Sequence, residues 1–225
     1  EGNITYNALC YIPAHAPYDL YSDSYERGLQ LYTKGVFILD KCKELIPNYL
    51  RFVKGLVDSA DLSLNISREM LQHDRQLGKI ATNLEKKILA ELNRTLKNDR
   101  EKYEKFFDVF GINLKWGSYE DYGMRKDSLK DLILFKTANQ DKYQTLKEYV
   151  ENMKDGQEKI YYAAGSSISK IDKLPQVEQV KDKEYDILYL TDYVDEFCIT
   201  AIQEYDKKKF TIFYKKKEHK PLHKH

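Results

Sequence analysis

The sequence predicts an α/β fold: a larger N-terminal and a smaller C-terminal αβα subdomain, joined by a helical segment. Three observations predict this fold. Alternating apolar residues near the start indicate strands, because successive side chains of a strand point to opposite faces. After Ser67 the apolar residues recur every three or four positions, as in a helix. After Gly156 strand and helix patterns alternate, which favours parallel strands joined by right-handed crossovers.

The first subdomain is expected to hold strands, a loop and a long helix. Strands are predicted over residues 4–12, 29–39 and 52–57, a surface loop over 14–28, and a short helix over 42–46. A long helix is predicted from Ser67 to the region of Leu96, because a serine hydroxyl can accept from the free amides of a first turn. The connector would contain a helix that starts with an Asn98–Glu101 capping box and ends at Gly111, a turn at Trp116, and a helix over 124–134.

The second subdomain is expected to alternate helices and strands. Thr145 and Glu148 form a capping-box pattern at the start of a helix over 146–153. Strands are predicted over 160–164, 185–190 and 210–214, helical pieces broken at Pro175 over 167–180, and a helix over 194–205. The expected boundaries are 1–97 for the larger subdomain, 98–134 for the connector, 135–214 for the smaller subdomain and 215–225 for a disordered Lys- and His-rich tail.

Composition argues against several classes of partner. Lysine and arginine number 37 against 36 acidic residues, so charge favours neither nucleic acid nor an anionic membrane. Cys10, Cys42 and Cys198 are far apart and odd in number, as expected for reduced, part-buried thiols of a cytoplasmic protein, with a catalytic thiol as the remote alternative. No apolar run is long enough to span a membrane and no leader is recognisable. The absence of an initial Met suggests a piece of a longer chain.

The strongest candidate site is Arg68 with Gln72. Arg68 would lie at the start of a helix, where the dipole favours anions over cations. An external anion, held by the guanidinium and the first-turn amides, would account for this placement, and Gln72 would project from the same face one turn later. The alternative is a surface arginine paired with Asp58, Asp61 or Glu69, which the residues alone leave equally open.

Other motifs are weaker. Gly165 follows a predicted strand, yet a single glycine is far more often an ordinary βα connection than a phosphate loop, and no Walker or dinucleotide motif is present. The spacing of His219, His223 and His225 could suit a metal, but these residues lie in a basic tail with no thiol nearby. A tail is therefore favoured over a metal site, and no metal is expected. No catalytic triad can be assembled from the histidines outside the tail. The aromatic residues Tyr18, Leu20, Tyr21 and Tyr25 indicate either sheet-edge packing or a surface for a partner protein.

Several segments together resemble the middle domain of the 90-kDa heat-shock chaperone family. They are residues 52–59 (Phe-Val-Lys-Gly-Leu-Val-Asp-Ser), 61–62 (Asp-Leu), 64–72 (Leu-Asn-Ile-Ser-Arg-Glu-Met-Leu-Gln), 12–13, 16–20, 36–38, 45–47, 159–162, Gly165 and 195–197. Together they cover the chain to about Phe213. Ser63 and Tyr49 depart from residues common elsewhere in the family and, with the short loop after Tyr21, resemble the bacterial branch.

The resemblance implies an ATP-dependent chaperone that acts in protein folding and the stress response. It implies that Arg68, assisted by Gln72, contacts the γ-phosphate of ATP held with Mg by an N-terminal domain, that Phe37 docks this domain, and that Tyr18, Leu20 and Tyr21 contact unfolded clients. The chain alone would bind no nucleotide, catalyse no reaction and remain a monomer, with dimerisation left to a C-terminal domain. The alternatives are a client-binding scaffold with no ATPase role, and a self-contained phosphate-binding enzyme that uses the Gly165 loop.

Overall fold

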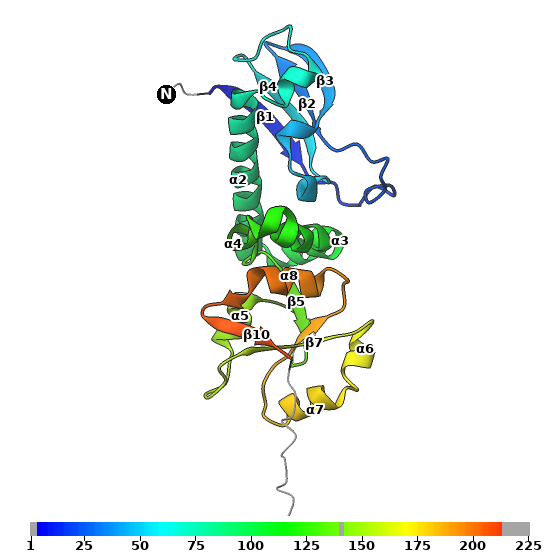
Figure 1. Ribbon diagram of the computed structural model, residues 1–225, viewed down its shortest axis with the longest axis vertical. Helices are drawn as coiled ribbons and strands as arrows, with labels where there is room; N and C mark the ends of the chain where they lie inside the picture. The colour runs from blue at the N-terminus through cyan, green and yellow to red at the C-terminus, as the bar shows by residue number, and fades with distance from the viewer. Residues whose placement is uncertain (1–3, 140–141, 213–225) are drawn as a thin grey trace, which may run out of the picture. The chain divides into compact units, whose positions relative to one another are not determined.

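The computed structural model describes residues 4–139 and 142–212, which fall into two compact units (Figure 1). The units are Glu1–Ile133 and Leu134–His225. Each unit has its own β-sheet together with helices. The expected α/β class with two subdomains is confirmed, and the helices expected to connect them lie within the first unit.

The first unit contains a four-stranded sheet in the order β1-β4-β2-β3. Its strands are β1 (Tyr6–Tyr11), β2 (Leu29–Thr33), β3 (Val36–Cys42) and β4 (Lys54–Ser59). β4 pairs antiparallel with β1 and parallel with β2, and β2 pairs antiparallel with β3. The single strand expected over 29–39 is wrong, because Lys34 and Gly35 both adopt positive φ and turn the chain back into a hairpin.

Two short 3-10 helices lead from β3 to β4. They are η1 (Lys43–Leu45), which confirms the short helix expected before Pro47, and η2 (Asn48–Leu50). Leu45, Tyr49 and Leu50 are fully buried. The apolar residues of this segment therefore belong to the core of the unit.

The long helix expected from Ser67 is interrupted. The structure has α1 (Arg68–Leu71), followed by α2 (Arg75–Asn98). Asp74 is extended between them, and its carboxylate accepts from the Leu77 amide at 2.8 Å, so it caps α2. The helical periodicity is confirmed within α2, where the apolar residues that recur along one side are buried: Leu77, Ile80, Leu84 and Leu92.

Helix α3 (Arg100–Tyr119) continues through Gly111 and Trp116, so the end expected at Gly111 and the turn expected at Trp116 are wrong. Its N-cap is Asp99, which accepts from the Lys102 amide, and not Asn98. A Cβ at Gly111 would lie 2.7 Å from the Phe107 ring. The glycine therefore serves close packing and not helix termination.

The helix expected over 124–134 is shorter than predicted. It is α4 (Lys126–Leu129), preceded by η3 (Glu120–Gly123), in which Asp121 and Tyr122 adopt left-handed backbone conformations. Such conformations are unfavourable for residues with a Cβ. They must therefore be stabilised by contacts of the surrounding side chains.

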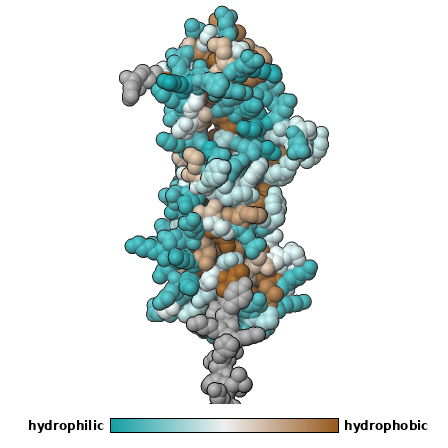
Figure 2. Space-filling view, in the orientation of Figure 1, coloured by the Kyte–Doolittle hydropathy of each residue, from teal (hydrophilic) through white to brown (hydrophobic). Residues whose placement is uncertain are grey.

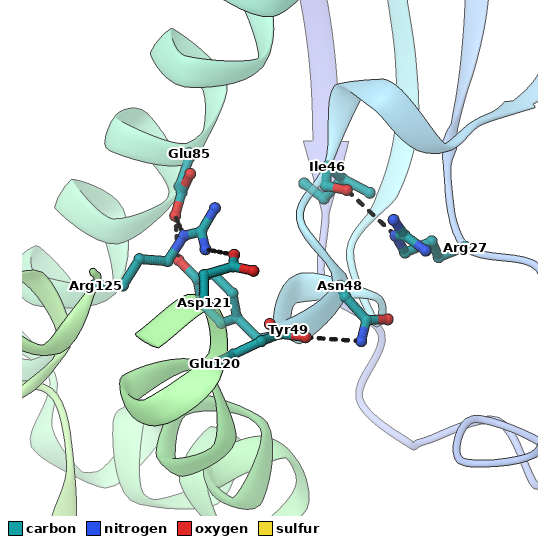
Figure 3. A network of polar contacts seen from close by, with 8 residues as sticks. All are labelled: Arg27, Ile46, Asn48, Tyr49, Glu85, Glu120, Asp121 and Arg125. Atoms are coloured by element: carbon teal, nitrogen blue, oxygen red, sulfur yellow. Dashed lines mark hydrogen bonds and ion pairs between the residues drawn. The ribbon is translucent and has the colours of Figure 1, made fainter. Parts of the chain in front are cut away.

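A polar network holds this turn against α2 and η2 (Figure 3). Arg125 donates to Glu85 and to Asp121, each at 2.6 Å, and its guanidinium lies over the Tyr49 ring. Tyr49 donates to Glu85 at 2.8 Å, and Asn48 donates to Glu120 at 2.9 Å. Burial, followed by the charge of Glu85, raises the pKa of Tyr49, so its phenol keeps the proton that it donates.

The second unit contains a six-stranded sheet in the order β6-β5-β8-β7-β10-β9. Its elements are β5 (Leu134–Thr137), β6 (Tyr143–Thr145), α5 (Leu146–Glu151), β7 (Ile160–Ala164), α6 (Ile168–Ile171), α7 (Pro175–Lys181), β8 (Leu188–Leu190), α8 (Asp195–Ile202), β9 (Glu204–Tyr205) and β10 (Lys208–Thr211). β7 runs parallel to β8 and β10, as predicted. β5, β6 and β9 add antiparallel strands that were not predicted.

The capping box expected at the start of α5 is confirmed. Thr145 accepts from the Glu148 amide, and Glu148 accepts from the Thr145 amide, each at 3.1 Å. The Pro175 break is also confirmed, because α6 ends at Ile171 and Pro175 opens α7. The Lys- and His-rich tail over 215–225 lies outside the described residues.

Hydrophilic residues cover most of the visible surface, and hydrophobic residues reach it in small areas (Figure 2). The helices of the described residues include none with both the length and the apolar character of a membrane span.

Arg125→Met should lower the free energy of unfolding by about 2 kcal/mol, since hydrogen bonds to partly buried charged groups are lost. Urea denaturation would measure this change. Arg94→Met is the matched control, because Arg94 pairs with Glu91 on the exposed side of α2, where solvent screens the ion pair, and its loss should leave the free energy of unfolding almost unchanged. Equal losses for the two variants would contradict a special role for Arg125.

Candidate functional site

The segment that carries Arg68 joins β4 to α2 and is anchored at two buried leucines. Leu62 is 4% exposed and Leu71 is 2% exposed. Most of the residues between them are exposed, with only Ile66 half-buried. The segment is therefore an exposed arc whose two ends are fixed in the core of the first unit.

Polar contacts add to the anchoring where the segment leaves the sheet. Asp61 accepts from the Thr5 amide at 3.0 Å, which ties the segment to the residue before β1. The Ser59 hydroxyl lies 3.2 Å from the Thr5 carbonyl, to which it donates, and accepts from the Asp61 amide at 3.4 Å. The first residues after β4 are thus bound to the sheet edge.

Ser67 caps the turn that presents Arg68, as predicted. Its hydroxyl accepts from the Met70 amide at 3.3 Å, and Arg68 is the first residue of α1. Because α1 has only four residues, it aligns far fewer peptide dipoles than the long helix that the sequence predicted. The guanidinium must therefore supply most of any attraction for an anion.

The Arg68 side chain is exposed and makes no hydrogen bond or ion pair with any residue between 4 and 212 that the structure describes. The carboxylates considered as its partners have other roles. Asp58 accepts from the Gly35 amide at 3.0 Å and Asp61 accepts from Thr5. Glu69 forms no ion pair with Arg68 within the described part of the chain. The surface ion pair is therefore not formed among the described residues, and the guanidinium is able to bind an external anion.

Gln72 follows Arg68 by one turn and has helical backbone angles at the C-cap of α1. Its side chain is exposed. The two residues predicted to act together thus remain neighbours on the helical turn, although α1 ends between them.

Phe37 lies on β3, which is an edge strand of the first sheet. Its side chain is 52% exposed, and its ring meets that of Tyr32 edge-on at 5.6 Å between centroids. Part of the ring is therefore available to another surface.

The aromatic loop over residues 14–28 is packed more tightly than predicted. Leu20 is fully buried, so its assignment as a client contact is corrected: it is a core residue. Tyr21 is 54% exposed, and its hydroxyl donates to Asn113 on α3 at 2.7 Å. Tyr18 is fully exposed. Among these three predicted contacts, only Tyr18 offers its whole ring to a partner.

Arg51 holds this loop and was not singled out in the sequence. Its guanidinium donates to the Leu20 carbonyl at 2.9 Å and lies near the rings of Tyr25 and Trp116, at 5.8 and 5.5 Å from their centroids. Tyr25 in turn donates to the Arg51 carbonyl at 3.1 Å. No local pattern predicts these contacts, because the partners are brought together only by the fold.

Gly165 serves packing. A Cβ at this position would lie 2.8 Å from the Ile171 side chain, and the Gly165 amide already donates to the Leu190 carbonyl at 3.1 Å. Ser167 caps the four-residue helix α6 by accepting from Lys170. These contacts are typical of a βα connection and do not support a phosphate loop.

None of the three cysteines forms a disulfide, and two of them, Cys42 and Cys198, are buried. Burial, followed by the charge of Glu44, raises the pKa of Cys42 to about 12. A thiol with such a pKa is a poor nucleophile at neutral pH, since the thiolate is the reactive form.

The described residues also contain no cluster of three His, Cys, Asp or Glu side chains that could hold a metal ion.

Comparisons with known proteins agree on one family. The model of the Hsp90 protein family matches residues 1–224. Chaperone protein HtpG of Clostridium perfringens is 56% identical over 93% of this chain and 34% of its own length, and that of Bacillus subtilis is 54% identical over the same shares. The chain thus spans about a third of the curated relatives it matches.

A solved structure supports the same assignment. The middle domain of a heat-shock protein from Plasmodium falciparum matches with a TM-score of 0.79 and 31% sequence identity. The match covers 96% of this chain and 85% of that one. The resemblance inferred from the sequence is therefore confirmed: the chain belongs to the Hsp90 family and corresponds to its middle domain.

Proposed function

We propose that this chain completes the ATPase site of a chaperone by presenting Arg68 to the γ-phosphate of ATP bound, with Mg, on the N-terminal domain. The observation that carries the proposal is an exposed guanidinium without a partner in the described residues, on a segment anchored at both ends. Gln72 would donate to the same phosphate from one turn away. The chain would thus supply one half of the site.

The chemistry suits this role. A guanidinium presents five donors in a planar fork that matches phosphate oxygens. An arginine supplied to a phosphoryl-transfer site from outside is worth on the order of 10³ to 10⁵ in rate in related systems. In water, solvent screens an exposed arginine, whereas docking would remove that water and strengthen its attraction for the phosphate. The half-exposed ring of Phe37 would contribute apolar area to the docked surface.

Adding this chain to the isolated N-terminal ATPase domain of an Hsp90-family chaperone should raise ATP hydrolysis, and Arg68→Ala should remove the increase. A coupled ATPase assay measures both rates. The loss should reach at least about tenfold, given what arginines contribute to phosphoryl transfer.

Arg94→Ala is the matched control, because Arg94 is also exposed but lies far along α2. Circular dichroism would verify that each variant folds. Full stimulation by Arg68→Ala, with the two domains shown to bind, would overturn the proposal in favour of a scaffold with no ATPase role.

We further propose that the fully exposed ring of Tyr18 contributes client-binding surface. The loop that carries it is held by Arg51 and by the Tyr21–Asn113 hydrogen bond, so the ring is presented from an ordered segment. An exposed aromatic side chain on an ordered loop loses little conformational freedom when it binds apolar segments of an unfolded protein.

Tyr18→Ser should weaken binding of an unfolded model protein by about threefold to tenfold, the range expected for removing about 1 kcal/mol of aromatic contact. Fluorescence anisotropy with a labelled, permanently unfolded protein would measure it. Tyr122→Ser is the control, since Tyr122 is equally exposed but lies in η3. Equal weakening by both variants would indicate nonspecific adhesion and contradict a client site at Tyr18.

A further inference from the structure

Thr33 joins the two ends of the bend at which the Arg68 segment leaves the sheet. It is the last residue of β2 and is fully buried. Its hydroxyl oxygen lies 2.6 Å from the Ser59 carbonyl oxygen and 3.0 Å from the Leu62 carbonyl oxygen. Ser59 is the last residue of β4, and Leu62 is the buried anchor of the segment.

A hydroxyl carries one hydrogen, so Thr33 must share it between the two carbonyls or alternate between them. In either case the Ser59 and Leu62 carbonyl oxygens both lie within hydrogen-bond distance of the Thr33 hydroxyl oxygen. A buried hydroxyl is costly unless it is bonded, so this geometry strongly favours one path for the backbone from Ser59 to Leu62. Neither of the other ties, from Asp61 and Ser59 to Thr5, reaches Leu62 directly.

The path of this bend sets where Arg68 lies. From Leu62 the chain proceeds through an exposed arc to the capped turn of α1, and the next buried anchor is Leu71. A change of direction at Leu62 would therefore displace the guanidinium relative to the sheet. In phosphoryl transfer such displacement matters, because a misplacement of about 1 Å can cost on the order of 10²-fold in rate.

We propose that Thr33 is a positioning residue for Arg68, acting through its hydrogen bonds to the Ser59 and Leu62 carbonyls. This inference rests on the proposed ATPase role of Arg68. It assigns to the end of β2 a function in catalysis although Thr33 itself touches no substrate. The hydroxyl, and not the methyl group, is the part of the side chain that acts.

The test compares two substitutions in the full-length chaperone. Thr33→Val keeps the shape and removes the donor, whereas Thr33→Ser keeps the donor and removes one methyl group. Thr33→Val should lower kcat for ATP hydrolysis by about tenfold to 10²-fold, as expected for a misplaced catalytic group, with KM for ATP unchanged. Thr33→Ser should retain kcat within about twofold of the unmodified protein.

Thr95→Val is the control for loss of a threonine hydroxyl, because Thr95 donates to the Glu91 carbonyl within α2 and forms no hydrogen bond with the described residues of the Arg68 segment, so this variant should leave kcat and KM unchanged. If Thr33→Val does not fold, Thr33→Ala replaces it in the comparison with Thr33→Ser. A kcat unchanged by the loss of the hydroxyl, or lowered equally by Thr33→Ser, would overturn the inference while Arg68→Ala still abolishes activity. Unchanged activity of Arg68→Ala would overturn the proposed function, and this inference with it.

Discussion

The segment between β4 and α2 must expose Arg68 to a partner and yet hold its backbone in one path. The arrangement of the first unit depends on how these two opposite requirements are met. Leu62 and Leu71 are buried, and burying a leucine contributes about 1.5–3 kcal/mol. Ordering each backbone residue between them costs about 1–2 kcal/mol, so two anchors alone do not hold such a segment in place. The caps at Ser67 and Asp74, together with the Thr33 hydroxyl, supply the additional local order.

The helix starts and the parallel strands of the second unit could be predicted because their signals are local, whereas the short antiparallel strands β5, β6 and β9 were missed. β7 has the predicted bounds, and Pro175 and the Thr145 capping box mark the starts of helices. The failures in the first unit arise where the same local pattern fits two structures. Gly111 resembles a helix end in sequence, but it lies in mid-helix because the Phe107 ring fills the space of its missing side chain. Hydrophobic periodicity continues across Asp74, so it does not reveal that the backbone becomes extended there.

The same distinction applies to the candidate site. Arg68 could be identified from the cap residue before it and from the family resemblance, both of which are visible along the chain. Thr33 could not, since its partners Ser59 and Leu62 lie 26 and 29 residues away and are brought near only when β2 pairs with β4. The resemblance implied a client contact for the loop around Leu20 as a whole, and the sequence does not show which residue of that loop is buried.

Three arginines of the first unit show why Arg68 suits an external phosphate. Arg125 binds Glu85 and Asp121, and Arg51 donates to Leu20 and Asn48, so their guanidinium groups are used within the unit. Recruiting either for a phosphate would break existing contacts and leave their partners unpaired, at a cost of about 1–3 kcal/mol for each buried group. Arg68 has no such contact among the described residues. It gains from any anion that another surface delivers, and the anchored ends of its segment limit the entropy lost on binding.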